Sequence, residues 1–190
     1  MNTREKPPHC KHWREGCRQG SVSFLLMSME FRIRDLLRPP IGILREEGVS
    51  EGMTVLDYGC GAGGFTIAAG RLVGKNGRIY GADIHPLAIR KAVAAARRHG
   101  LGHVEIISGE DLGRIPDKSV DIALLFDVLH ELPDPAVDLG VIGRVLKPGG
   151  TLSVRDHHLD QAMIEKVVTS CSDFRLVERR GERLRFLKAL

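Results

Sequence analysis

Four glycines stand close together at positions 59, 61, 63 and 64, where the backbone could approach a bound ligand. The stretch reads Asp57-Tyr58-Gly59-Cys60-Gly61-Ala62-Gly63-Gly64, after a short apolar run and before a segment with helical periodicity. Glycine carries no side chain to hold a ligand away, and a helix that begins here offers N–H groups without intrahelical partners. The spacing of Gly59, Gly61 and Gly64 also satisfies the fingerprint of dinucleotide-binding enzymes. The glycines therefore indicate an adenosine-bearing cofactor without choosing between NAD and another.

Two acidic residues narrow that choice. Asp57 precedes the first glycine, where a carboxylate would repel the phosphates of NAD but could meet the ammonium group of a methionine moiety. Asp83 closes the next predicted strand, and its two oxygens could accept hydrogen bonds from both hydroxyls of a ribose. Asp83 could also cap the helix predicted to begin at Pro86. Asp57 in particular favours a cofactor that carries methionine over NAD.

The motif Asp57-x-Gly59-x-Gly61-x-Gly63 resembles the first motif of the class I S-adenosylmethionine-dependent methyltransferases. Stretches 116–121 and 146–151 resemble later landmarks of this family, and the resemblance spans residues 51–156. It points to the small-molecule, type 11-like branch and implies S-adenosylmethionine as the cofactor. The residues that the resemblance assigns to the cofactor are Asp57, Gly59, Gly61, Gly63, Asp83, Ile84, Phe126 and, at the adenine, Glu110 with Asp111 as the alternative.

Polar residues follow the fourth and fifth predicted strands, at the edge where open parallel sheets bind ligands. Methyl transfer needs a base only when the acceptor must lose a proton. Asp127 and His130 lie three positions apart, and we expect a carboxylate–imidazole pair suited to proton removal. Asp127 could instead cap a helix, and His130 could pack beneath the pocket without titrating. After the fifth strand, the candidates for binding the acceptor are Arg155, His157 and His158.

The histidines of this region also raise the question of a metal site. His157 and His158, with Asp156 and His130, have the atoms that zinc or iron prefers. Neighbouring histidines in a strand point to opposite faces, and methyl transfer requires no metal, so we expect none. The cysteines and histidines of residues 9–17 lack the paired spacing of a zinc motif.

Short apolar runs alternate with longer helical segments after residue 50, which predicts a doubly wound, mostly parallel sheet. The predicted strands are Thr54–Tyr58, Arg78–Ala82, Val104–Ile107, Val120–Phe126, Thr151–Arg155, Phe174–Arg179 and Arg183–Leu187. The predicted helices are Phe65–Val73, Pro86–His99, Pro135–Leu146 and Asp160–Ser170. The last two strands are joined by so short a link that we expect an antiparallel hairpin. The whole is a seven-stranded α/β sheet of the Rossmann-like methyltransferase type.

The chain divides into a tail and one domain. Residues 1–26 are expected to be a flexible basic tail, and residues 27–190 a single methyltransferase domain. Within the domain we expect an N-terminal helical lid at 27–50, hinged at Pro39-Pro40. A cofactor-binding core follows at 51–156, and a C-terminal helix and β-hairpin at 157–190.

Composition limits the partners. The net charge is +4, but residues 1–20 alone carry five Lys or Arg against two Glu, so the remainder is nearly balanced. This argues against a nucleic-acid-binding face, as do the low aromatic content and the absence of an Asn-Pro-Pro-Tyr stretch after the fourth strand. No apolar run reaches the ~20 residues that span a bilayer. We expect a cytoplasmic enzyme with a small-molecule acceptor, no nucleic acid and no membrane, and a possible homodimer.

Two other functions fit parts of the pattern. A nucleotide-dependent oxidoreductase would use a similar sheet, but Asp57 and the antiparallel ending disfavour it. A catalytically silent, S-adenosylmethionine-binding regulatory subunit would carry the same Asp57, Asp83 and glycines. Turnover, rather than binding, separates such a subunit from an enzyme.

Overall fold

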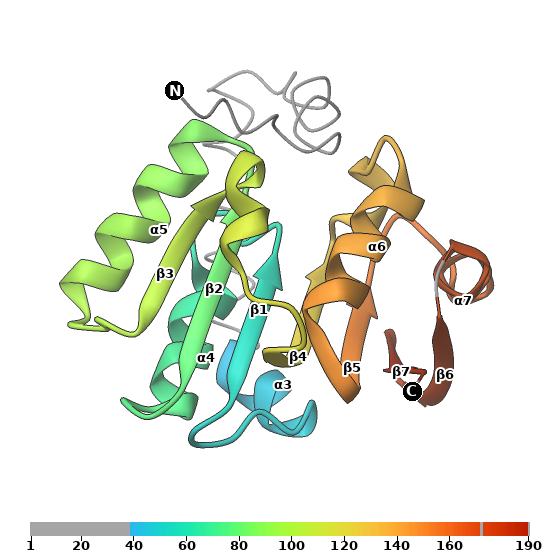
Figure 1. Ribbon diagram of the computed structural model, residues 1–190, viewed down its shortest axis with the longest axis horizontal. Helices are drawn as coiled ribbons and strands as arrows, with labels where there is room; N and C mark the ends of the chain where they lie inside the picture. The colour runs from blue at the N-terminus through green and yellow to red at the C-terminus, as the bar shows by residue number, and fades with distance from the viewer. Residues whose placement is uncertain (1–38, 172, 190) are drawn as a thin grey trace.

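The computed structural model describes residues 39–171 and 173–189, which form a layered α/β structure around one sheet (Figure 1). The sheet has seven strands in the order β3-β2-β1-β4-β5-β7-β6. Strands β1 to β5 pair in parallel, and β7 pairs antiparallel with both β5 and β6. The strands are β1 (Thr54–Tyr58), β2 (Arg78–Asp83), β3 (Val104–Ser108), β4 (Val120–Phe126), β5 (Leu146–Arg155), β6 (Phe174–Arg180) and β7 (Arg183–Lys188). The predicted parallel sheet and its antiparallel end are confirmed.

Helices cover both faces of this sheet. They are α3 (Pro40–Glu46), α4 (Gly64–Val73), α5 (Pro86–Arg98), α6 (Pro135–Val145) and α7 (Gln161–Cys171), with short 3-10 helices η1 (Gly109–Arg114) and η2 (Leu129–Glu131). One apolar cluster joins α3 and α4 to the sheet, and a second joins α6 and α7 to its opposite face. Within residues 39–171 and 173–189, none of the helices has the length and apolar character to cross a membrane.

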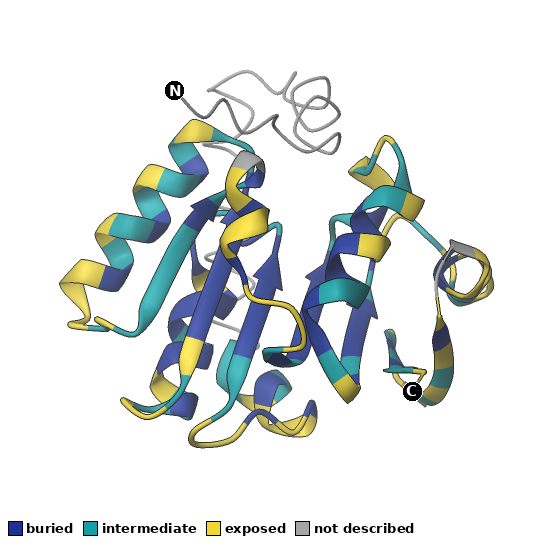
Figure 2. Cartoon of the chain, viewed as in Figure 1, coloured by how far each residue is buried: buried dark blue, intermediate teal, exposed yellow. Residues whose placement is uncertain are grey.

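The central strands are buried on both sides, as Figure 2 shows. In β1, Val55 packs in the cluster on the α4 side, whereas Leu56 packs in the cluster on the α6 side. Successive side chains of a strand alternate between faces, so Asp57 points to the α4 side. Tyr58 returns to the α6 side, where its hydroxyl donates a hydrogen bond to the buried carboxylate of Asp138. The end of β1 thus sends one carboxylate toward the beginning of α4.

The start of β5 corrects one prediction. We expected the strand to begin at Thr151 after a Pro-Gly-Gly turn, but β5 begins at Leu146 and includes that segment. Its pairing with β4 changes register between Val120 and Ile122, and Gly149 has a positive φ of 75°. The glycines therefore form an irregularity within the strand, where backbone pairing continues on both sides.

The N-terminal lid is described only in part. Helix α3 begins at Pro40, as expected for the segment after the Pro39-Pro40 hinge, and Leu44 buries its side chain against the sheet. Residues 27–38 of the expected lid and the expected tail at 1–26 lie outside the described residues. The division into tail, lid, core and C-terminal part stays a prediction.

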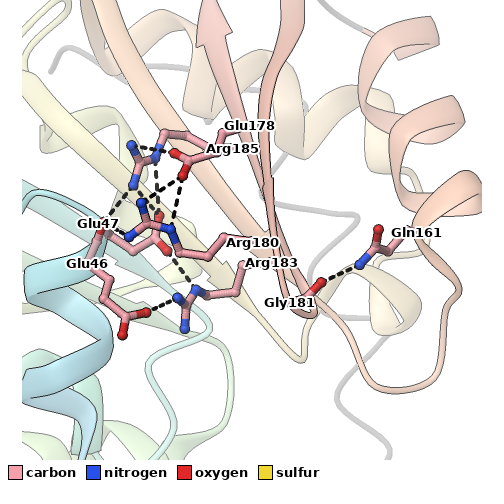
Figure 3. Close-up of polar contacts among 8 residues, drawn as sticks. All are labelled: Glu46, Glu47, Gln161, Glu178, Arg180, Gly181, Arg183 and Arg185. Carbon is pink, nitrogen blue, oxygen red and sulfur yellow. Dashed lines mark hydrogen bonds and ion pairs between the residues drawn. The ribbon is translucent and has the colours of Figure 1, made fainter.

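An ionic cluster joins α3 to the C-terminal hairpin (Figure 3). Glu47, at the end of α3, has a buried side chain that lies 2.7 Å from Arg183 Nε and 3.3 Å from Arg185 Nη2. Arg185 also donates to the Glu46 carbonyl oxygen at 2.8 Å and pairs with Glu178 at 2.9 Å. Cationic side chains at the last carbonyls of a helix are favourable because those carbonyls carry partial negative charge. The cluster fixes two segments that are far apart in the sequence.

Candidate functional site

The glycine loop is held against the ends of two neighbouring strands. The N–H groups of Gly59 and Cys60 both donate to the Ala82 carbonyl of β2, at 2.8 and 2.9 Å. Gly59, Gly61 and Gly63 all have positive φ, a conformation that other residues rarely adopt. A Cβ on Gly59 would overlap the Val128 side chain. The loop therefore requires glycine at 59, and it contacts the segment that follows β4.

Asp83 organises the loop from the end of β2. Its Oδ2 accepts the Gly61 N–H at 2.8 Å, and its Oδ1 accepts the His85 N–H at 2.8 Å. Each carboxylate oxygen can accept a second hydrogen bond, so these contacts leave capacity for two ribose hydroxyls. The cap of α5 is His85, whose Nδ1 accepts the Leu87 N–H at 3.2 Å. Asp83 is therefore not the helix cap that we considered as an alternative.

Asp57 is buried beside the loop. Its side chain meets α4, where the Thr66 hydroxyl donates to Oδ2 at 2.5 Å, and only 4% of the residue is exposed. The pKa of Asp57 is raised to about 6, chiefly by burial; hydrogen bonding to Thr66 lowers it, and the nearby charge of Asp83 contributes to the rise. Burial likewise raises the pKa of Asp83, partly offset by its hydrogen bonds to backbone N–H groups. Desolvation disfavours both negative charges, so a cationic ligand would relieve a cost already present in the fold.

These features fit S-adenosylmethionine. The hydrogen bonds given above come to Asp57 and Asp83 from neutral groups, a hydroxyl and backbone N–H groups. An ammonium group and ribose hydroxyls of a ligand could donate to the remaining lone pairs of the two carboxylates. The glycine loop leads into α4, whose first N–H groups have no side-chain cap. Cys60, within the loop, is buried, and this burial raises the pKa of its thiol well above the ordinary value. Cys60 is therefore a small packing residue and not a nucleophile.

The other expected cofactor residues lie after β2, at the end of β4 and on η1. Ile84 is partly buried and packs against the larger apolar cluster. Asp111 is exposed on η1, whereas the side chain of Glu110 lies outside the described part of the chain, so the choice between them at the adenine stays open. Phe126 ends β4, and its ring meets that of Phe65 edge to face, with centroids 5.0 Å apart.

Asp127 directly follows β4 and, with His130 and Arg155, belongs to the polar edge of the sheet that we call the rim. Its backbone has a positive φ of 58°, and its N–H donates to the Arg155 carbonyl at 2.7 Å. Its carboxylate, 5% exposed, accepts from Arg155 Nη2 at 2.7 Å and lies 3.0 Å from His157 Nδ1. The Arg155 guanidinium in turn lies 5.3 Å from the centre of the Phe126 ring. Asp127 does not cap a helix, because the residue in that position before η2 is Val128.

His130 meets a different carboxylate from the one expected. Its Nδ1 lies 2.8 Å from Asp156 Oδ2, so the imidazole of our predicted pair is joined to Asp156 while Asp127 binds Arg155 and His157. The sequence indicated acid and imidazole in the right region, but spacing along the chain could not show which acid folds back onto His130. Asp156 was considered from the sequence only among the rim residues and as a metal ligand, not as the partner of His130, and Thr66 was not considered at all.

The adjacent histidines also differ from expectation. His157 and His158 follow the last residue of β5 and lie in a turn, where the alternation of a strand no longer applies. Their ring centroids are 4.0 Å apart, and the His158 ring lies 4.1 Å from that of His130. The prediction that they point to opposite faces was wrong. Across residues 39–171 and 173–189, no three His, Cys, Asp or Glu side chains are placed to hold a metal ion.

Curated proteins similar to this chain include demethylmenaquinone methyltransferases. The demethylmenaquinone methyltransferase of Geobacillus kaustophilus is 32% identical over 109 residues, which are 57% of this chain and 47% of that protein. The enzyme of the same name from Staphylococcus aureus strain MRSA252 is 33% identical over 110 residues, 57% of this chain and 44% of that protein. The chain thus spans about half the length of the curated relatives it matches.

Solved structures give similar folds. An S-adenosylmethionine-dependent methyltransferase from Aquifex aeolicus superposes with a TM-score of 0.73 at 26% identity, over 82% of this chain and 93% of that one. An arsenic(III) S-adenosylmethionine methyltransferase from Chlamydomonas reinhardtii has a TM-score of 0.59 at 24% identity, over 74% and 64% of the two chains, and shows the shared fold alone.

A family model described as a methyltransferase domain matches residues 49–185, most of the chain. The predicted resemblance and the Rossmann-like methyltransferase fold are thereby confirmed. The chain belongs to this family of methyltransferase domains, whose class I fold it shares, and its cofactor is S-adenosylmethionine.

Proposed function

We propose that the chain transfers the methyl group of S-adenosylmethionine to a small-molecule acceptor bound at the rim formed by Asp127, His130 and Arg155. The observation that carries this proposal is the close approach of Gly59 to Val128, which places the segment after β4 against the cofactor loop. A group bound at this rim would lie beside a cofactor bound on the loop. When bound, the cofactor supplies an electrophilic methyl carbon, and the protein mainly orients the partners and excludes water.

Residues of the glycine loop and its flanks hold the cofactor in this proposal. Asp83 accepts hydrogen bonds from the ribose hydroxyls while keeping its contact with Gly61, and Asp57 meets the ammonium group. Gly59, Gly61 and Gly63 let the backbone come close. The remaining contacts are assigned to Ile84, Phe126 and either Glu110 or Asp111.

The acceptor side is built from polar groups with fixed positions. Arg155, with 12% of its side chain exposed, is held by Asp127 and lies over the Phe126 ring. His157 and His158 line the same turn, next to His130. Curated relatives named for demethylmenaquinone support a small molecule as the class of acceptor. That compound itself is not part of the proposal.

Transfer of labelled methyl groups tests the proposal. The purified chain is incubated with methyl-labelled cofactor and a metabolite extract, and labelled small molecules are separated by mass. We expect a labelled product with the wild-type chain, none with Asp83→Ala, and the same product with Asp117→Ala. Asp117 is an exposed acid that pairs with Arg144, and exposed pairs contribute little to stability. Cofactor binding without any labelled product would contradict the proposal and favour a silent regulatory subunit.

A further inference from the structure

Asp156 is a buried acid that joins the two segments of the rim. Its Oδ2 accepts the backbone N–H of His130 at 3.0 Å, and its Oδ1 accepts the backbone N–H of His158 at 3.0 Å. Its side chain is fully buried. A buried carboxylate costs free energy unless it is hydrogen-bonded, and these two bonds also fix its direction. Asp156 is thus held rigidly beside Nδ1 of His130.

This carboxylate selects one form of the imidazole. A carboxylate accepts hydrogen bonds, so the 2.8 Å contact between Asp156 Oδ2 and His130 Nδ1 places the ring hydrogen on Nδ1. The neutral ring then carries a lone pair on Nε2. Glu131 Oε1 lies 3.8 Å from Nε2, beyond hydrogen-bonding distance, and 22% of the His130 side chain is exposed. This is the arrangement in which an acid orients an imidazole to accept a proton.

We propose that His130 removes a proton from a hydroxyl group of the acceptor, and that Asp156 is the positioning residue that directs its Nε2 to that hydroxyl. The proposal rests on the methyl transfer proposed above. The O–H bond breaks and its proton passes to Nε2, while an electron pair of the oxygen forms the bond to the methyl carbon. The bond from that carbon to sulfur breaks with its electrons on sulfur, which changes from a cationic sulfonium to a neutral thioether. His130 then releases the proton to water.

The surroundings favour oxygen as the attacking atom. A thiol is partly ionised near neutral pH without help, and a thioether or tertiary amine has no proton to lose. The Arg155 guanidinium is fixed in the same rim by Asp127. A fixed cation near a hydroxyl stabilises the negative charge that grows on its oxygen during proton loss. We therefore take a hydroxyl compound as the acceptor and a methyl ether as the product; methylation of a carbon acid or of a protonated amine, which also have a proton to lose, is an outcome of the test.

Several titratable groups surround His130, so a pH profile alone would not assign the base. They are Asp156, Glu131 and His158 in direct proximity, then His157, and behind His157 the pair of Asp127 and Arg155. A readout at the His130 ring itself is required.

The first experiment reads the position of the ring hydrogen without cofactor or acceptor. Protein with ¹⁵N-labelled histidine is studied at pH 8 by long-range proton–nitrogen correlation, and His130→Gln identifies the resonances. We expect the hydrogen on Nδ1 in the wild type. In Asp156→Asn the side chain loses its negative charge, and an NH2 donor replaces one of the two acceptor oxygens, so the share of rings with the hydrogen on Nδ1 falls and the share with it on Nε2 rises. The matched control Glu131→Gln removes the other nearby charge and leaves the hydrogen on Nδ1. Two results would overturn the proposed pairing of Asp156 with His130: a wild-type ring with its hydrogen on Nε2, or a ring hydrogen whose position is the same in Asp156→Asn as in the wild type.

The second experiment measures labelled methyl transfer to the metabolite extract. His130→Ala is expected to lower transfer at pH 7 by about a hundredfold, the usual effect of a general base, and Asp156→Asn by about tenfold or more. Calorimetry should show unchanged cofactor affinity in both variants, and added imidazole should restore part of the His130→Ala activity. Equal transfer by His130→Ala and wild type, or a product methylated on sulfur, nitrogen or carbon, would overturn this inference but leave methyl transfer intact. No transfer by the wild type would instead refute the proposed function, and the ring-hydrogen experiment would still decide the pair.

Discussion

Replacing Asp57 with asparagine removes a charge that the fold buries beside Asp83. Burial raises the pKa of Asp57 from 3.8 to about 6. Because each pKa unit corresponds to about 1.4 kcal/mol, keeping Asp57 ionised in the folded chain at pH 8 costs about 3 kcal/mol. The asparagine side chain can still accept the Thr66 hydroxyl hydrogen bond through its oxygen. The variant should therefore be more stable than the wild type at pH 8, by at most this amount.

The raised pKa of Asp57 also determines how the free energy of unfolding changes with pH. Between pH 3.8 and about 6 the folded chain binds more protons at Asp57 than the unfolded chain does, so this group makes stability fall as pH rises through that window. Asp57→Asn lacks this contribution. The difference in free energy of unfolding between the variant and the wild type should be small near pH 4 and grow to its full value above pH 7. Asp83 contributes a slope of the same sign to both proteins, so only its coupling to the Asp57 charge remains in the difference.

Urea unfolding of the cofactor-free proteins, followed by circular dichroism from pH 4.5 to 8, measures this difference. Asp117→Asn, at an exposed acid, serves as a control for the loss of a carboxylate elsewhere on the chain. A variant less stable than the wild type at pH 8, or a difference independent of pH, would refute the reasoning that desolvation dominates at Asp57.

Three further changes probe other parts of the molecule. Gly59→Ala should destabilise the fold by about 2 kcal/mol or more through its positive φ and its clash with Val128, and adding Val128→Ala should recover part of that loss in urea unfolding; additive effects would show that the clash is absent. Glu47→Ala should cost about 3 kcal/mol, because two arginines lose a buried partner; a loss that high salt removes would mark the cluster as a weak surface network. Thr66→Val removes the bond that lowers the pKa of Asp57, so cofactor affinity measured by calorimetry should fall more steeply below pH 7 than in the wild type; parallel pH curves would contradict this.

The centre of the sheet was predictable from local pattern. The bounds of β1 and β4 agree with the predicted strands, because strands buried on both faces appear as continuous apolar runs between turn residues. The short helices η1 and η2 were not predicted, since one or two turns of 3-10 helix produce no clear periodicity. The beginning of β5 was wrong for a related reason: Pro148-Gly149-Gly150 is typical of a turn, and only the neighbouring strand β4 makes it part of the sheet.

The sequence predicted where the polar residues of the site lie, but not which of their side chains contact one another. The expected polar residues after β4 and β5 do lie together, because parallel strands end at one edge of the sheet. Which side chains touch depends on long-range geometry. The left-handed backbone at Asp127 turns its carboxylate to Arg155 and leaves His130 to Asp156, and no spacing in the sequence encodes that turn.

Calorimetric titration with S-adenosylmethionine at pH 8 tests whether Asp57 and Asp83, the acids beside the glycine loop, bind the cofactor. We expect one site per chain in the wild type, no competition by NAD, and affinity lowered about tenfold or more in both Asp57→Asn and Asp83→Asn, because each loses charge-assisted hydrogen bonds to the ligand. Circular dichroism must show both variants folded. Unchanged affinity in the two folded variants, or displacement of the cofactor by NAD, would contradict the assignment of these acids to the cofactor.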